Sequence, residues 1–130
     1  MSIRKSILAA SFALSGLAAG AAGAAQISPE AAVELLSSQD SAPPIVLDLR
    51  SATAYEAGHL PGAMNVDAAD PYFGPFLDSL ERDKAYLLYD AGGSKSAEVE
   101  ATMNSLGFPT VYTLSGGMPA WQSADLPLGE

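Results

Sequence analysis

The stretch "YLLYDAGGSKS", residues 86–96, decides the fold of this chain. An apolar run ends at an acid, Asp90, and two glycines, a serine, a lysine and a second serine follow. A short apolar run is typical of a strand that is buried on both faces, and the polar segment from Ser94 onward opens a helical pattern. The stretch therefore predicts a strand, a loop and a helix, with Asp90 at the carboxyl end of the strand.

The same alternation of short strands and short helices continues on both sides of this stretch. Strands are expected at residues 45–49, 63–66, 85–89 and 110–114, and helices within 27–40, 51–58, 71–80, 95–107 and 116–128. Such an alternation predicts an α/β fold, with a central parallel β-sheet flanked by helices on both faces. Ligands of such sheets bind outside the carboxyl ends of the strands, which makes the loop after Asp90 the candidate site.

Residues 1–25 have the layout of a secretory signal peptide. Arg4 and Lys5 give a positive start, and an uncharged run rich in Ala, Leu and Gly follows and ends in small residues. Cleavage after Ala24 or after Ala25 fits this pattern. An uncleaved membrane anchor is the alternative, because the run is long enough to span a bilayer. We expect a signal peptide at 1–25, a folded domain at 26–130, and a periplasmic or secreted protein that leaves the membrane after cleavage.

Charge and cysteine content exclude several classes of function. The chain has a net charge of −9, and removal of Arg4 and Lys5 leaves four basic residues against 15 acids, a net charge near −11. This charge disfavours nucleic acid and anionic membrane surfaces as partners. The chain contains no cysteine, which excludes disulfides and thiolate chemistry, and its single histidine argues against a zinc site. We expect no metal and no cofactor.

The loop after the central strand has the composition of an anion-binding loop. Gly92 and Gly93 allow backbone turns with positive φ. The helix that begins at Ser94–Ser96 has free N–H groups in its first turn, and these groups form a cradle for an anion. A thiolate at the first loop position would be a stabilised nucleophile. Here that position holds a carboxylate, and Asp90 can itself be the anion in the cradle.

Two segments resemble the rhodanese family. They are "IVLDLRSATAYEAGHLPGAMNVD" and "YLLYDAGGSKSAEVEATMNSLGFPTVYTLSGGMPAWQSADLPL", and the resemblance extends from Ile27 to Leu128. It implies an α/β fold with a central parallel sheet. It also implies a site loop in which active members have a cysteine first, a glycine fourth, usually an arginine sixth and a serine seventh. That cysteine carries a persulfide and passes sulfur to cyanide or another thiophile.

The chain departs from this family pattern at two loop positions. Asp90 stands in the place of the cysteine, and Lys95 stands in the place of the arginine, which keeps the positive charge but loses bidentate anion recognition. An aspartate at the first position resembles the inactive halves of two-domain sulfurtransferases. The resemblance therefore implies the fold without the activity, and no catalytic residue is expected. The equivalents of the active-site loop are Asp90, Ala91, Gly92, Gly93, Ser94, Lys95 and Ser96.

Several functions of the loop stay open from the sequence. The loop has six residues from Asp90 to Lys95, as in the sulfurtransferase branch, and the related phosphatases use one more, so phosphate esters are not expected substrates. Asp90 could act as a nucleophile in phosphoryl transfer or as a metal ligand, but the loop offers no second carboxylate for Mg²⁺ or Ca²⁺. A capping role for Asp90 is favoured. Lys95 could bind an anion in the loop, but a local pair with Asp90 or with Glu98 is favoured.

Other polar residues receive structural interpretations. His59, in the family segment "GHLPGA", could serve as a general base, but a structural hydrogen bond is favoured. Asp48 and Arg50 are expected to form a structural pair, with Glu56 as another possible partner for Arg50.

The aromatic residues leave a choice between packing and partner contact. Tyr72, Phe73 and Phe76 lie in a connection that could present an exposed contact to a partner, although core packing is favoured. Trp121 is expected to pack near the last turn. The preferred function is an exported, catalytically silent module that binds or regulates a protein partner. The alternatives are an enzyme that uses Asp90 in non-thiol chemistry, with a metal or a phosphate, and a structural subunit of an exported complex.

Overall fold

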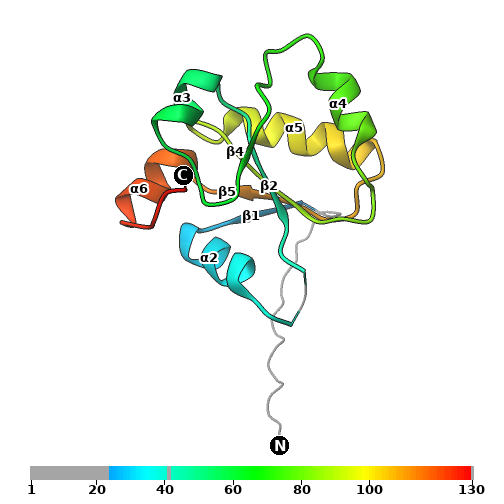
Figure 1. Ribbon diagram of the computed structural model, residues 1–130. Coiled ribbons are helices and arrows are strands. Elements are labelled where there is room, and N and C mark those ends of the chain that lie inside the picture. Colours follow the sequence, from blue (N-terminus) through cyan, green and yellow to red (C-terminus); the bar gives the residue numbers. More distant parts are fainter. Residues whose placement is uncertain (1–23, 41, 130) are drawn as a thin grey trace, which may run out of the picture.

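A computed structural model describes residues 24–40 and 42–129. Figure 1 shows a twisted sheet with helices packed around it. The strands are β1 (Ala24–Ile27), β2 (Ile45–Asp48), β3 (Met64–Asn65), β4 (Tyr86–Tyr89) and β5 (Val111–Leu114). The helices are α2 (Pro29–Ser37), α3 (Ala52–Ala57), α4 (Phe73–Ser79), α5 (Ser94–Ser105) and α6 (Gly117–Ser123).

The strands form one parallel sheet in the order β1-β5-β4-β2-β3. The predicted α/β fold and the four predicted strands are confirmed. The expectation was incomplete at the sheet edge, because the sequence pattern gave no strand before α2. The structure adds β1, which pairs with β5 from Ala24 opposite Val111 to Ile27 opposite Leu114.

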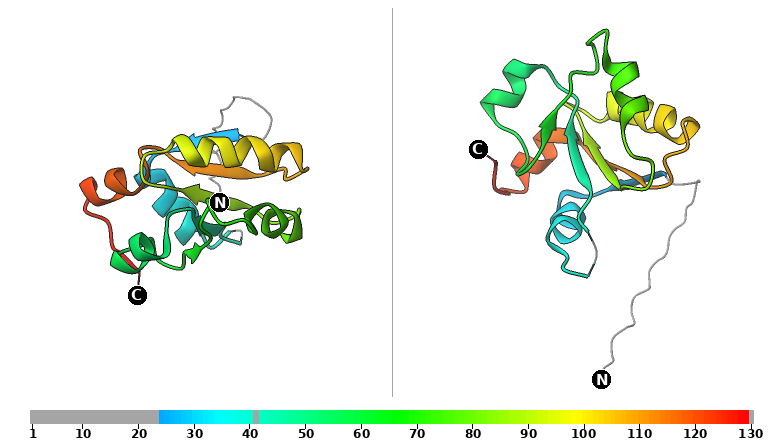
Figure 2. Two further views of the ribbon diagram at one scale, coloured as in Figure 1. Left: turned by 90° about the horizontal axis from the view of Figure 1, so that it is seen from above. Right: turned by 45° about the vertical axis from the view of Figure 1, so that its right-hand side comes forward.

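Each face of the sheet buries its own apolar cluster. Odd and even positions along a strand point to opposite faces, so neighbouring residues such as Leu87 and Leu88 lie in different clusters. One face carries α2, α3 and α6, and the other carries α4 and α5 (Figure 2). The prediction of helices on both faces is confirmed. Because helices cover both faces of the sheet, water reaches neither face of β4, and all residues of this strand are buried.

The helix ends follow the local sequence signals. The Ser28 side chain accepts a hydrogen bond from the backbone N–H of Ala31, and Pro29 occupies the first position of α2, as predicted. Gly107 follows α5 with a φ of 95°, a left-handed conformation that favours glycine. These signals account for the start of α2 and the end of α5.

The predicted signal peptide, residues 1–25, lies outside the described residues except for its last two, Ala24 and Ala25. Both belong to β1, which thus begins before the predicted domain boundary at residue 26. Within residues 24–40 and 42–129, no helix has the length and apolar character needed to cross a membrane.

Candidate functional site

The candidate site lies where the connections of two neighbouring strands diverge. β2 and β4 are paired in the sheet, with Asp48 opposite Tyr89. β2 continues into α3 on one face, and β4 continues into α5 on the other face (Figure 1). Such a switch point opens a crevice at the carboxyl ends of the strands. Asp90 follows β4 directly and stands at the carboxyl end of this strand.

The carboxylate of Asp90 occupies the cradle formed by the loop and the first turn of α5. The backbone N–H of Gly93 donates to its Oδ1 at 2.6 Å, and the backbone N–H of Lys95 donates to its Oδ2 at 2.8 Å. The hydroxyl of Ser96 lies 3.3 Å from Oδ1. Only 7% of Asp90 is exposed. The donors that could hold a bound anion therefore hold a side chain of the chain itself.

The rest of the loop faces outward around this carboxylate. Ala91, Gly92 and Ser94 are exposed. Gly93 has a φ of 106°, as expected, but the expectation of a positive φ at Gly92 is wrong. One left-handed residue, Gly93, directs the chain into α5, and the N–H groups of Gly93 and Lys95 point at Asp90. The Lys95 ammonium lies 3.2 Å from a carboxylate oxygen of Glu98, which confirms that predicted pair.

The start of α6 supports the loop from behind, which the sequence did not reveal. The backbone N–H of Met118 donates to the carbonyl oxygen of Asp90 at 3.0 Å. Gly117 has a φ of 63°, and a Cβ at this position would overlap the Asp90 carbonyl and the backbone of Ala91 and Gly92. Only a glycine lets the two backbones approach this closely. The terminal "SGGMPAW" segment is thus part of the site.

Gly117→Ala is expected to destabilise the fold by at least about 2 kcal/mol, because it adds a left-handed alanine and pushes against the site loop. Gly92→Ala is the matched control, since a Cβ at Gly92 has open space and needs no positive φ. Urea unfolding of the two variants measures the difference. Equal stability of the two variants would contradict the proposed support of the loop by α6.

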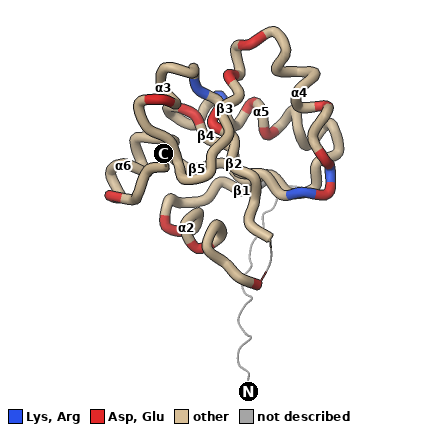
Figure 3. Tube along the Cα trace, viewed as in Figure 1, with Lys and Arg blue, Asp and Glu red and all other residues tan. Residues whose placement is uncertain are grey.

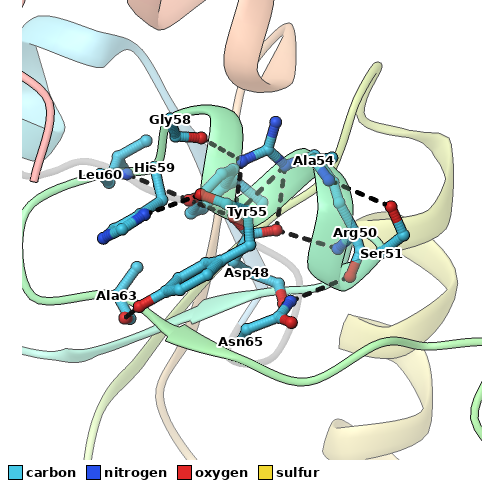
Figure 4. A network of polar contacts seen from close by, with 11 residues as sticks. Asp48, Arg50, Ser51, Ala54, Tyr55, Gly58, His59, Leu60, Ala63 and Asn65 are labelled. Atoms are coloured by element: carbon cyan, nitrogen blue, oxygen red, sulfur yellow. Dashed lines mark hydrogen bonds and ion pairs between the residues drawn. The ribbon is translucent and has the colours of Figure 1, made fainter. Parts of the chain in front are cut away.

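The loop after β2 is held by a buried ion pair (Figure 4). Asp48 has no exposed surface, and its carboxylate accepts from Arg50 Nε at 3.0 Å and from Arg50 Nη2 at 2.7 Å. The same Nη2 donates to the carbonyl of Gly58 at 2.6 Å. The hydrogen bonds to Asp48, and then the charge of Asp48, raise the pKa of Arg50. The predicted structural pair is confirmed, and Glu56 does not contribute to it.

Tyr89 connects this pair to the strand that carries the site. Its hydroxyl donates to Asp48 Oδ2 at 2.6 Å and accepts from the backbone N–H of Leu60 at 3.1 Å. Burial, followed by the hydrogen bond to Asp48, raises the pKa of Tyr89 far above its ordinary value. Tyr89 therefore stays a neutral donor. Asp48, Arg50 and Tyr89 fix the position of β4 next to β2, and with it the position of Asp90.

His59 and Trp121 have structural environments. His59 is 6% exposed, its Nδ1 lies 2.8 Å from the carbonyl oxygen of Tyr55, and its ring stacks on the Tyr55 ring at 3.8 Å. This confirms the structural interpretation of His59. Trp121 is buried in the core, and its Nε1–H donates to the carbonyl of Pro127 at 2.9 Å, as packing near the last turn requires.

The aromatic connection before α4 divides into core and surface. Phe73 and Phe76 are partly buried against the apolar cluster under α4 and α5, which confirms core packing for these two. Tyr72 is 77% exposed, so the prediction of core packing is wrong for this residue. It stands at a hollow of about 490 Å³ whose lining includes Asp67 and Asp70. Residues 90–96 do not line this hollow, so it is a surface separate from the Asp90 loop.

Acidic side chains of the described residues are too dispersed to form a metal centre. No group of three or more His, Asp or Glu residues in 24–40 and 42–129 is arranged to hold a metal ion. The two carboxylate oxygens of Asp90 accept hydrogen bonds from the backbone N–H groups of Gly93 and Lys95. Donors of this kind stabilise a negative charge and are used to hold an anion.

Fold and site together define a parallel α/β protein with an anion-type loop at the carboxyl end of a central strand. The family model that describes the rhodanese-like domain matches residues 28–124. The chain belongs to the rhodanese-like family. It does so without a cysteine anywhere in its sequence.

Curated relatives and solved structures agree with this assignment. The chain is 30% identical over 92 residues to a thiosulfate sulfurtransferase GlpE of Pseudoalteromonas translucida, covering 71% of this chain and 83% of the relative. It is 32% identical over 98 residues to the Pseudomonas entomophila protein of the same name, covering 75% and 84%. A rhodanese-like domain from Anabaena superposes with a TM-score of 0.68 at 28% identity, covering 81% of this chain and 79% of that one.

Proposed function

We propose that this chain is an exported rhodanese-like domain without sulfurtransferase activity, and that it acts as a binding or regulatory module. The observation that supports this most strongly is the Asp90 carboxylate, which accepts the N–H groups of Gly93 and Lys95 at the position of the nucleophile. A carboxylate cannot carry a persulfide, and the chain has no cysteine elsewhere. The activity in the names of the GlpE relatives therefore does not extend to this chain.

Two surface properties support a binding role. Tyr72 exposes an aromatic ring at a hollow, and exposed aromatic rings are frequent anchors in protein interfaces. The surface is acidic, with Asp and Glu spread along the trace and Lys and Arg confined to two stretches in the view of Figure 3. An acidic surface repels nucleic acids and acidic proteins, so the partner of this module is a neutral or basic protein.

Export to the periplasm or the medium rests on the leader pattern of residues 1–25. A chain without cysteine suits this destination, because it cannot form incorrect disulfides in an oxidising compartment. The sequence left two other functions open, which are non-thiol chemistry at Asp90 and a structural subunit of an exported complex. Both are compatible with the leader, and they differ in the role of the Asp90 loop.

An anion titration tests whether the loop is filled from within. Sulfate added to the parent protein is expected to leave the amide signals of Gly93 and Lys95 unchanged in ¹H–¹⁵N spectra, because Asp90 already uses their N–H groups. In Asp90→Ala the same signals are expected to shift with sulfate. Shifts in the parent equal to those in the variant would contradict the proposal. Shifts caused by Mg²⁺ or phosphate in the parent alone would favour non-thiol chemistry at Asp90.

A further inference from the structure

Glu100 is a partly buried carboxylate whose hydrogen-bond donor, among the residues that the structure describes, is a neutral backbone N–H. It lies on α5, and its Oε2 accepts a hydrogen bond from the backbone N–H of Ala25 in β1 at 3.0 Å. Burial raises the pKa of Glu100, and the Ala25 N–H acts in the opposite direction. None of the ion pairs among the described residues includes Glu100. A carboxylate removed from water in this way is stabilised by a cation at the position of its neutral partner.

The sequence places a processing site at this contact. Small residues precede both candidate bonds, with Ala22 and Ala24 before the first and Gly23 and Ala25 before the second. Cleavage after Ala24 would convert the Ala25 nitrogen from an amide into a free amine. Cleavage after Ala25 would remove the nitrogen that faces Glu100 and leave the carboxylate without this partner.

We propose that the leader is cut between Ala24 and Ala25, and that the new α-ammonium group forms an ion pair with Glu100. This inference rests on the proposed export and specifies the bond that export breaks. Water adds its hydroxyl to the Ala24 carbonyl carbon as the C–N bond breaks, and its proton goes to the Ala25 nitrogen. With an ordinary pKa of about 7.7–8.0, that amine is protonated at neutral pH.

The ion pair has a structural consequence for the sheet. After this cleavage β1 keeps Ala25, Gln26 and Ile27, which pair with Tyr112, Thr113 and Leu114 of β5. A three-residue edge strand with a free end frays readily. The pair between the Ala25 ammonium and Glu100 holds that end against α5, and the pair forms only once the leader has been removed. Cleavage one residue later would shorten β1 to two residues.

The mass of the exported product tests the position of the cut. The full chain is expressed in a bacterium that exports it, and the purified product is measured by intact mass spectrometry. We expect the mass of residues 25–130. The mass of residues 26–130 would overturn this inference and leave the proposed export standing. The mass of the complete chain would overturn cleavage at either bond and would favour the uncleaved membrane anchor.

A second measurement on the same product tests the ion pair. The pKa of the α-amino group is measured by NMR in the parent, in Glu100→Gln and in Glu98→Gln, whose carboxylate pairs with Lys95 at the surface. We expect a raised α-amino pKa in the parent and in Glu98→Gln, and a return to about 7.7–8.0 in Glu100→Gln. A thermal midpoint lowered by a few degrees is expected in Glu100→Gln alone. An ordinary α-amino pKa in the parent would overturn the ion pair even if the variant did not fold.

Discussion

Asp90→Cys is expected to transfer sulfur from thiosulfate to cyanide at least about tenfold faster than the parent chain, a difference of about 1.4 kcal/mol in the barrier. The reason is the geometry of the loop. The N–H groups of Gly93 and Lys95 and the hydroxyl of Ser96 surround the Asp90 carboxylate. The same donors would stabilise a thiolate and lower its pKa, which increases the fraction of reactive nucleophile.

Ser94→Cys is the matched control for this variant. Ser94 belongs to the same loop, but its side chain is exposed and lies outside the set of donors that surround Asp90. Like Asp90→Cys, the Ser94→Cys substitution introduces one thiol into a chain that has no cysteine. Thiocyanate formation by both variants is followed under identical conditions. If folded Asp90→Cys is no faster than Ser94→Cys, the loop has lost the geometry of the family's chemistry.

Asp48→Asn is expected to lower the free energy of unfolding by about 3 kcal/mol, because it removes the charge from one side of a buried pair and leaves Arg50 uncompensated. Asp48 is fully buried and the Arg50 side chain is 13% exposed. The substitution also weakens the hydrogen bond from the Tyr89 hydroxyl. Thermal unfolding is expected to show a midpoint lower by about 10 °C or more.

The control for this variant is Asp78→Asn, in a pair of the same type at the surface. Asp78 lies 2.8 Å from Arg82, but its side chain is 72% exposed. An exposed pair of this kind contributes less than about 1 kcal/mol. Equal losses of stability in the two variants would mean that the buried pair does not fix β2 beside β4.

Local sequence signals predicted those parts of the molecule whose partners are close in the chain. Ser28 and Pro29 indicated the start of α2, and the two-residue spacing of Asp48 and Arg50 indicated their pairing. The apolar runs predicted β2, β4 and β5, and each of these strands contributes to both core clusters. Asp90 and the glycines after it predicted the anion-type loop, because the residues that form it are consecutive.

Contacts between distant residues could not be predicted in the same way. The support of the Asp90 loop by Gly117 and Met118 joins segments that meet only in the folded sheet. The hydrogen bond from Tyr89 to Asp48 spans 41 residues. β1 was missed because its two alanines continue the composition of the leader, and an edge strand needs no long apolar run.

We propose that the Asp90 carboxylate fills the site of this rhodanese-like domain in place of a nucleophile. The most direct test is the rate of thiocyanate formation by the unmodified chain with thiosulfate and cyanide. We predict a rate equal to that of a reaction without protein. A rate that rises with the concentration of the chain and saturates with thiosulfate would contradict the claim, because it would require a sulfur acceptor that Asp90 cannot be.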